Sequence, residues 1–147
     1  MIARGGSNGT IYVKDLAVIS DELLASSSLD TTVHIWNVTT YSSKFTLNSH
    51  TNNVWGVKVI GENVIASGSL DNTIKLWNTT NGTLIRTLTG HTHKIYYGLD
   101  LLVSDTLISG SFDSTIKLWQ ISTGTLLNSI GVLPSKLIYS LAVIGGN

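Results

Sequence analysis

The sequence predicts an all-β fold built from repeated antiparallel sheets, and three observations support this prediction. The pattern Ser-x-Ser-x-Asp-x-Thr, followed by an alternating segment, occurs three times and ends at Trp36, Trp77 and Trp119, which lie 41 and 42 positions apart. A fixed period of this length is typical of folds in which each copy is one supersecondary unit stacked on the next. Apolar and polar residues alternate along each copy, and turn residues separate the alternating segments.

Each copy is predicted to be a β-hairpin closed by a tight turn. In the middle copy Asp71 occupies the turn, where a carboxylate can accept backbone N–H groups two residues further on. In the strand that follows, Ile74 and Leu76 share one face and Lys75 and Trp77 the other. Because the other two copies repeat this alternation, the same hairpin is expected three times.

The remaining elements follow the same period. We expect strands at 10–19, 23–28, 32–37 and 43–47 in the first unit, at 53–60, 63–69, 73–78 and 83–88 in the second, and at 94–102, 106–111, 115–120 and 125–130 in the third. A lone strand is predicted at 136–144, where Leu141-Ala142-Val143-Ile144 repeats Leu16-Ala17-Val18-Ile19. Residues 1–9 are expected to be a loop or a truncated strand, and an alternative register lays residues 2–14 on 65–77.

Composition narrows the class of protein. The chain has 147 residues, enough for one compact domain, and no cysteine, which excludes disulfides and thiolate metal sites and favours a cytoplasmic location. Nine basic and nine acidic residues give no net charge, so we expect neither nucleic acid nor a membrane surface as a partner. No apolar run is long enough to span a bilayer, and the start lacks a hydrophobic signal core.

The repeats resemble the WD-repeat (β-transducin-like) family of β-propellers. The resemblance rests on the recurring Ser/Asp/Trp hairpin, on Gly90-His91 and on the period, and it covers almost the whole chain. It implies a partial WD-repeat β-propeller of about three and a half repeats, with four-stranded antiparallel blades near 10–47, 53–88 and 94–130 and the first strand of a fourth at 136–144. The dipeptides Trp36-Asn37, Trp77-Asn78 and Trp119-Gln120 stand where the family often has Trp-Asp.

The resemblance also implies a buried hydrogen-bond relay in each blade. The expected members are His50, Ser67, Asp71 and Trp77 in the second blade, His91, Ser109, Asp113 and Trp119 in the third, and Ser26, Asp30 and Trp36 in the first. Donors and acceptors balance, because the indole N–H can donate to the serine hydroxyl, the hydroxyl can donate to one imidazole nitrogen, and the other imidazole N–H can donate to the carboxylate. Gly9 aligns near the histidine position of the first blade and Leu133 at that of the last unit, so these relays are expected to be incomplete.

Three polar groupings invite a chemical interpretation. Ser, His and Asp together could form a hydrolase triad, but the set recurs at the repeat period and each serine already has a tryptophan, which favours a structural role and no catalytic residue. His91 and His93 could share one face of a strand as metal ligands, but no third ligand stands nearby, so no metal or other cofactor is expected. For Lys75 and Lys117 we expect packed apolar stems with heads that reach water.

Partners of WD-repeat propellers commonly dock on the narrower top face and central opening, so the resemblance implies a binding surface there. The candidates are the apolar residues before each turn Asp, Leu29, Leu70 and Phe112, and polar residues that lead into the innermost strands, Asn53, His93, Lys94 and Lys136. Trp55, Tyr96 and Tyr97 follow directly on those strands. An apolar patch with a polar rim suits a protein or peptide partner. The alternative is that the three apolar residues pack against adjacent blades.

These observations predict a non-catalytic scaffold that binds protein or peptide partners through the top face. The alternative is an enzyme or a carbohydrate-binding propeller that uses the central-channel loops, for which the sequence offers no supporting motif. Propellers host many functions, so the fold alone does not choose between them. Because a closed propeller normally needs four to eight blades, three alternatives stay open: the chain continues in a longer protein, copies of it self-associate to close the ring, or it exists alone as a marginally stable open arc.

Overall fold

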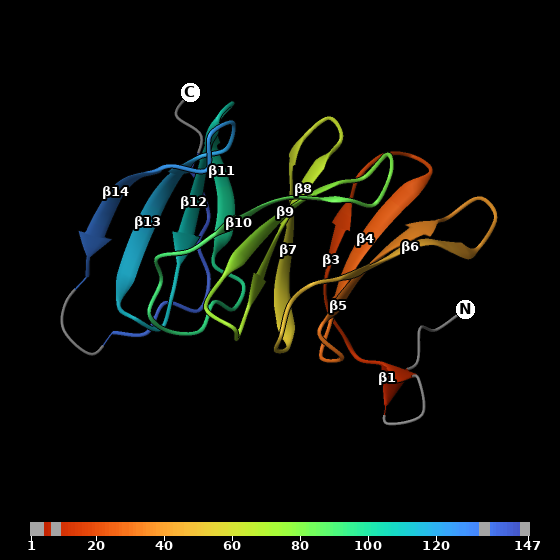
Figure 1. Cartoon of the computed structure of the whole chain (residues 1–147), viewed down its shortest axis with the longest axis horizontal. Coiled ribbons are helices and arrows are strands. Elements are labelled where there is room, and N and C mark those ends of the chain that lie inside the picture. Colours follow the sequence, from red (N-terminus) through yellow and green to blue (C-terminus); the bar gives the residue numbers. More distant parts are fainter. Residues whose placement is uncertain (1–4, 7–9, 133–135, 145–147) are drawn as a thin grey trace.

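The computed structural model describes residues 5–6, 10–132 and 136–144, and the described residues fold as an all-β protein. Three four-stranded antiparallel sheets, the blades, stand side by side (Figure 1). The first blade is β3 (Val13–Val18), β4 (Leu23–Ser28), β5 (Thr32–Asn37) and β6 (Ser42–Asn48); the second is β7 (Val54–Gly61), β8 (Val64–Ser69), β9 (Ile74–Asn78) and β10 (Leu84–Leu88); the third is β11 (Leu99–Val103), β12 (Thr106–Gly110), β13 (Thr115–Gln120) and β14 (Leu126–Gly131). This is the predicted architecture.

Each blade is a simple meander in which consecutive strands pair. The innermost strands β3, β7 and β11 contact one another across the blades, and the outermost strands β6, β10 and β14 lie at the opposite edge. β4, β5 and β13 have the predicted bounds, because their apolar alternation and turn residues are unambiguous. No helix that could cross a membrane occurs among the described residues.

The innermost strand of the third blade is shorter than predicted, because it contains one extra residue. Five positions separate Lys94 from Leu99, whereas four separate the equivalent residues Asn53 and Val57 of the second blade. The extra residue is Tyr97, whose backbone N–H donates to a carbonyl of the segment after the third blade at 2.9 Å. The ladder with β12 therefore starts at Leu99, and 94–98 is not part of the strand that we predicted at 94–102.

Two short strands precede the first blade. β1 (Gly5–Gly6) and β2 (Thr10–Ile11) form a two-stranded sheet in which Gly5 pairs with Ile11. This is the register of Gly68 with Ile74 in the second blade, as the alternative alignment of residues 2–14 on 65–77 predicts. Thr10 and Ile11 therefore belong to this hairpin and not to the first strand of the blade, which begins at Val13.

The segment 136–144 lies beside the third blade, where the first strand of a fourth blade is expected. The N–H of Ile138 donates to the carbonyl of Ser111, as the N–H of Ile95 donates to that of Ser69 between the second and third blades. Its β pairing is limited to one parallel bridge between Tyr97 and Ser140. No second strand lies beside it in the described part of the chain, and a strand without a ladder partner is only marginally held.

The hydrophobic core lies between the blades and consists of two clusters. Between the first and second blades the buried residues are Ala25, Val33, Ile35, Leu47, Val54, Val57, Ile65 and Trp77; between the second and third they are Ile60, Ala66, Ile74, Leu76, Leu88, Ile95, Leu99, Leu107 and Trp119. Each cluster contains side chains from the two sheet faces that lie against each other in adjacent blades. Burial of this apolar surface therefore fixes each blade against its neighbour.

A second contact joins the blades at their outer edge. Phe45 on β6 packs against Gly82, and a Cβ at Gly82 would come within 2.8 Å of the Phe45 ring. Arg86 on β10 packs in the same way against Gly124, where a Cβ would lie 2.1 Å from its side chain. Both glycines have positive φ, of 73° and 76°, in the last turn of their blade. The equivalent residue of the first blade is Tyr41, with φ of 54° and an exposed side chain.

Candidate functional site

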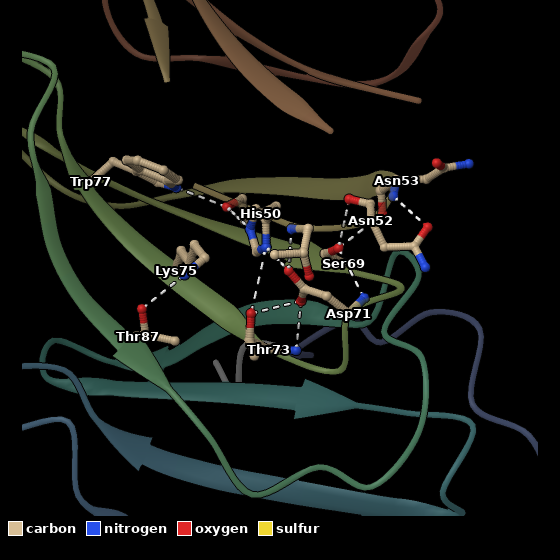
Figure 2. A network of polar contacts seen from close by, with 11 residues as sticks. His50, Asn52, Asn53, Ser69, Asp71, Thr73, Lys75, Trp77 and Thr87 are labelled. Carbon is tan, nitrogen blue, oxygen red and sulfur yellow. Dashed lines mark hydrogen bonds and ion pairs between the residues drawn. The ribbon is translucent and has the colours of Figure 1, made fainter. Parts of the chain in front are cut away.

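The second blade contains a complete relay of four side chains. The Trp77 indole N–H donates to the Ser67 hydroxyl at 2.8 Å, Ser67 lies 2.8 Å from His50 Nε2, and His50 Nδ1 lies 2.7 Å from Asp71 Oδ2. Figure 2 shows His50 between Trp77 and Asp71, with Asp71 at the turn between β8 and β9. A neutral imidazole satisfies the chain, accepting from serine at Nε2 and donating to the carboxylate at Nδ1.

The Asp71 carboxylate also holds the turn around it. Its Oδ1 accepts the N–H and hydroxyl of Thr73 at 2.9 and 2.7 Å, and its Oδ2 accepts the N–H of Thr51 at 3.1 Å. Burial alone would raise the pKa of Asp71, but the hydrogen bonds from His50, Thr73 and Thr51 outweigh it and hold the pKa well below its usual value. The carboxylate is therefore ionised and joins the connection between β6 and β7 to the turn between β8 and β9.

The third blade repeats this relay. Trp119 donates to Ser109 at 2.8 Å, Ser109 lies 2.7 Å from His91 Nε2, and His91 Nδ1 lies 2.7 Å from Asp113 Oδ2. Burial lowers the pKa of His91, more than the neighbouring Asp113 raises it, so the imidazole is neutral as the relay requires. Burial opposes ionisation of Asp113, but hydrogen bonds from Thr115, Thr92 and His91 lower its pKa to about 2.

The first blade has only part of the relay. Trp36 donates to Ser26 at 2.8 Å, and Asp30 accepts the N–H and hydroxyl of Thr32 at 3.0 and 2.6 Å. No described histidine joins Ser26 to Asp30. His34 instead stacks on Trp36, two positions further along β5, with ring centres 5.2 Å apart. Gly9 and Leu133, which align with the missing histidines, lie outside the described residues.

The candidate binding residues lie at the end of the blades that carries the turns around Asp30, Asp71 and Asp113, together with the connections into β7, β11 and 136–144. This end, here called the Asp-turn face, is at the lower side of Figure 1. Leu29, Leu70 and Phe112 are half-buried there, as are Asn53 and Lys94, whereas His93 and Lys136 are exposed. The backbone joins two pairs of them, because Asn53 accepts the N–H of Leu70 at 3.0 Å and Lys94 that of Phe112 at 3.0 Å.

Only some of these candidates gather into one cluster. The Phe112 ring lies 4.5 Å from that of Tyr96, 4.6 Å from that of Tyr139 and 6.1 Å from that of His93. Leu29 occupies the equivalent turn of the first blade. The sequence prediction did not include Tyr139 or Lys14. Both occupy the same position of the repeat as Tyr96 and Trp55, and comparison of the repeats at that position would have identified them.

The family model described as "WD domain, G-beta repeat" matches residues 7–37, 41–78 and 82–120, which is most of the chain. The chain belongs to the WD40-repeat family. The crystal structure of the WD40 β-propeller domain of Doa1 is similar, with 32% sequence identity and a TM-score of 0.72. The match covers 88% of this chain and 42% of that one, so the WD40 repeats here span less than half the length of that structure. No curated protein matches the chain in sequence.

The geometry of the WD40 relays opposes a catalytic role for their serines. Ser67 and Ser109 are fully buried, and each hydroxyl already lies between an indole N–H and an imidazole nitrogen. A nucleophilic serine must instead be open to substrate beside oxyanion donors. In the described part of the chain, no three His, Asp or Glu side chains converge as a metal site. The relays are therefore suited to holding the blades rather than to chemistry.

The lysines beside the WD40 relays differ from the sequence expectation. Lys75 and Lys117 are both 8% exposed, and their ammonium groups donate to hydroxyls of the outermost strands instead of reaching freely into water. Lys75 donates to Thr87 at 3.0 Å, as Figure 2 shows, and Lys117 donates to Ser129 at 2.8 Å. Each hydroxyl sits directly across the ladder from its lysine, which shortens the distance that the side chain must cover.

Proposed function

We propose that this chain is a non-catalytic scaffold that binds a protein or peptide partner on the Asp-turn face. The observation that carries the proposal is the aromatic cluster around Phe112, which is only half-buried and lies beside exposed His93. Half-buried aromatic side chains with a polar rim are the usual anchors of protein interfaces. WD40 propellers commonly act as such scaffolds, which supports the same assignment.

A rigid frame under this face is a further reason for the proposal. The relay of each complete blade fixes the turn that carries Leu70 or Phe112, because Asp71 and Asp113 each bind the loop that leads to the innermost strand of their own blade. Side chains held by such a frame lose little conformational freedom on binding, which favours affinity. The same frame leaves no exposed nucleophile among the relay residues, so we infer no enzymatic activity for it.

The decisive experiment first selects peptides that bind the whole chain and then measures their binding to variants in which apolar residues of the Asp-turn face are replaced. A phage-displayed random peptide library is panned on the immobilised chain, and the selected peptides are titrated against Phe112→Ser and Leu70→Ser variants. Leu84→Ser, on the exposed outer strand β10, is the matched control. We expect the first two variants to bind less tightly while their circular dichroism spectra and Tm stay close to those of the parent.

Three results would overturn this proposal. Unfolding of the Phe112→Ser and Leu70→Ser variants, without selective loss of binding in folded protein, would show that these residues pack the blades instead. Equal weakening by Leu84→Ser would place the binding surface elsewhere. Failure to select any peptide that depends on the Asp-turn face would also reject it.

The uncovered side of the first blade supports a second, structural proposal. Leu16 and Val18 on β3 are 57% and 73% exposed. We propose that further blades of the same family, from a longer form of this chain, cover this side, which agrees with the 42% coverage of the Doa1 domain. Sedimentation of the chain alone would test the alternative, because a tight dimer would indicate that a second copy closes the ring.

A further inference from the structure

Four side chains from equivalent positions of the innermost strands form a continuous row on the Asp-turn face. In each blade, the N–H of the residue before the turn Asp donates to a carbonyl of the segment that leads into the innermost strand. The row side chain of each blade lies two residues after the residue that carries this carbonyl. The fourth position follows Ile138, which bonds to the third blade as Ile95 bonds to the second. The row consists of Lys14, Trp55, Tyr96 and Tyr139, and the repeat itself therefore places them side by side.

The members of the row are in contact with one another. Lys14 Nζ lies 4.5 Å from the centre of the Trp55 ring, the rings of Trp55 and Tyr96 are 4.6 Å apart, and those of Tyr96 and Tyr139 are 5.6 Å apart. Phe112, from the turn of the third blade, adds a ring against both tyrosines. The result is an aromatic strip that crosses three blades and reaches the segment 136–144.

Part of this strip is open to solvent. Tyr139 is 56% exposed, and Tyr97, the extra residue of the third blade, is 37% exposed with its ring 5.8 Å from Trp55. The indole N–H of Trp55 has no hydrogen-bond partner among the described residues, unlike those of the three relay tryptophans. An acceptor on a ligand could satisfy it after a small movement of the side chains that cover it.

Positive charge borders the strip. The lysines of the Asp-turn face are Lys14, Lys94 and Lys136, and none of the ion pairs within the described residues includes them. Two of the three turn carboxylates of the same face are occupied, because Asp71 and Asp113 are bound in their relays. Asp30, at the turn of the first blade, is exposed and, within the described residues, accepts hydrogen bonds only from Thr32 of its own turn. A ligand that meets this face therefore finds aromatic surfaces and unpaired ammonium groups.

We infer that the row from Lys14 to Tyr139 binds an extended peptide segment in which acidic residues alternate with proline or aromatic residues. This inference rests on the proposed function and names the chemistry of its partner. Proline and aromatic side chains pack on aromatic strips, and the acidic side chains pair with the lysines. A cationic peptide fits poorly, because Lys14 already occupies the face of Trp55 and would repel it.

Single-stranded nucleic acid could also stack on such a strip, but the charges favour a peptide. Binding to a phosphate backbone draws on many basic residues, and this chain has as many acidic residues as basic ones. A peptide needs only a few local ion pairs. The nucleic-acid alternative is nevertheless a measured outcome of the test.

The test is a fluorescence anisotropy titration of the whole chain with short labelled probes. The first probe alternates Glu with Phe and Pro; the second replaces each Glu with Lys, the third replaces Phe and Pro with Ser, and the fourth is single-stranded oligo-dT. We expect the first probe to bind about tenfold tighter than each of the others, and its affinity to fall as salt is raised, because the ion pairs are exposed.

Variants with matched controls locate the site. Lys14→Glu should weaken the first probe about fivefold and Tyr139→Ala about tenfold, from the loss of one ion pair and of one aromatic contact. Lys44→Glu and Tyr41→Ala are the controls, because Lys44 also lies over an aromatic ring, 5.4 Å from Phe45, and Tyr41 is also exposed. Both controls should leave the affinity within about twofold of the parent.

The outcomes separate this inference from the proposed function. If peptides are selected on the Asp-turn face but lack acidic residues, or if the Lys probe or the oligo-dT binds as tightly as the Glu probe, the inference is wrong while a scaffold role for a different ligand stands. Equal weakening by Lys44→Glu would also reject it. If no peptide binds this face at all, both proposals fail.

Discussion

The Asp15 carboxylate accepts a hydrogen bond from the backbone N–H of Val57 at 3.0 Å and so joins the innermost strand of the first blade to that of the second. A similar contact, two positions further along both strands, lies two blades further on, where Asp100 accepts the N–H of Val143 at 2.7 Å. Innermost strands are sheet edges, and a carboxylate that satisfies an edge N–H fixes the neighbour in register. Lys58 adds an ion pair to Asp100 at 2.7 Å.

This contact predicts how firmly the segment 136–144 is held. In an Asp100→Ala variant, we expect the amide of Val143 to exchange with solvent about five- to tenfold faster, because one charge-assisted hydrogen bond is lost. Hydrogen exchange followed by NMR measures the rate directly. Asp105→Ala is the control, since Asp105 bonds to Ser122 and should leave the Val143 amide unchanged. Equal exchange in both variants would contradict the assignment.

The relay in the second blade predicts a difference between two tryptophans. Trp77→Phe removes the indole donor and leaves the buried Ser67 hydroxyl with one partner fewer, so the free energy of unfolding should fall by about 2 kcal/mol or more. Trp55→Phe removes an indole N–H that has no partner among the described residues, so its effect should stay below about 1 kcal/mol. Urea unfolding measures both, and equal losses would argue against the relay as a source of stability.

The outer-edge contact predicts an effect at Gly124. Gly124→Ala places a Cβ 2.1 Å from the Arg86 side chain and imposes a φ of 76° on an L-residue. We expect the free energy of unfolding to fall by about 1–3 kcal/mol. Gly131→Ala is the matched control, because nothing lies within 4 Å of its Cβ, and it should change stability by less than about 0.5 kcal/mol. Thermal unfolding measures both changes, and an equal loss of stability in the two variants would contradict the prediction.

The relay of the third blade predicts a two-step loss of stability in acid. Because the pKa of His91 is lowered on folding, its contribution is complete above pH 6.5 and declines as the pH falls below that value, where the unfolded chain gains the proton first. The pKa of Asp113 falls from 3.8 to about 2, so its contribution is complete above 3.8 and is lost as the pH falls toward 2.

Tm measured by circular dichroism between about pH 3 and pH 8 checks this expectation. The parent should show a shallow decrease below pH 6.5 and a steeper one in the acid range, to which other buried carboxylates such as Asp71 contribute. Asp113→Asn should flatten the acid step relative to the parent, and a Tm that does not change with pH would contradict the prediction.

The repeat made most of the fold and both complete relays predictable from sequence. In each complete relay the serine stands four residues before the turn Asp and the tryptophan six after it, and the histidine stands 21 or 22 residues before it, so His50 and Trp77 could be placed without coordinates. The start of β11 was harder to predict, because it depends on the single extra residue Tyr97. One extra residue shifts the alternation by one position, and the apolar and aromatic side chains on both sides of it, in Ile95-Tyr96-Tyr97-Gly98-Leu99, hide that shift. Sequence also could not show that the head of Lys75 meets Thr87, because which hydroxyl lies opposite depends on the register of the outermost strand.

The aromatic row illustrates a different limit. Trp55 and Tyr96 were expected near the binding face, but the contact of Lys14 with Trp55 depends on how closely two blades approach, which no local pattern encodes. The contribution of Tyr139 depends on the segment 136–144 lying against the third blade, although only one bridge holds it as a strand. Such contacts are set by packing between repeats rather than within them.

Tyr41 makes the three units non-interchangeable. In the second and third blades a glycine receives the side chain of the preceding outer strand, whereas the first blade presents the Cβ of a tyrosine at that point. A shuffled gene that put the first unit after the second would drive Arg86 into Tyr41. A unit placed before the first one would therefore need a small side chain at the position of Phe45 and Arg86. The order of the first two units along the chain is thus fixed.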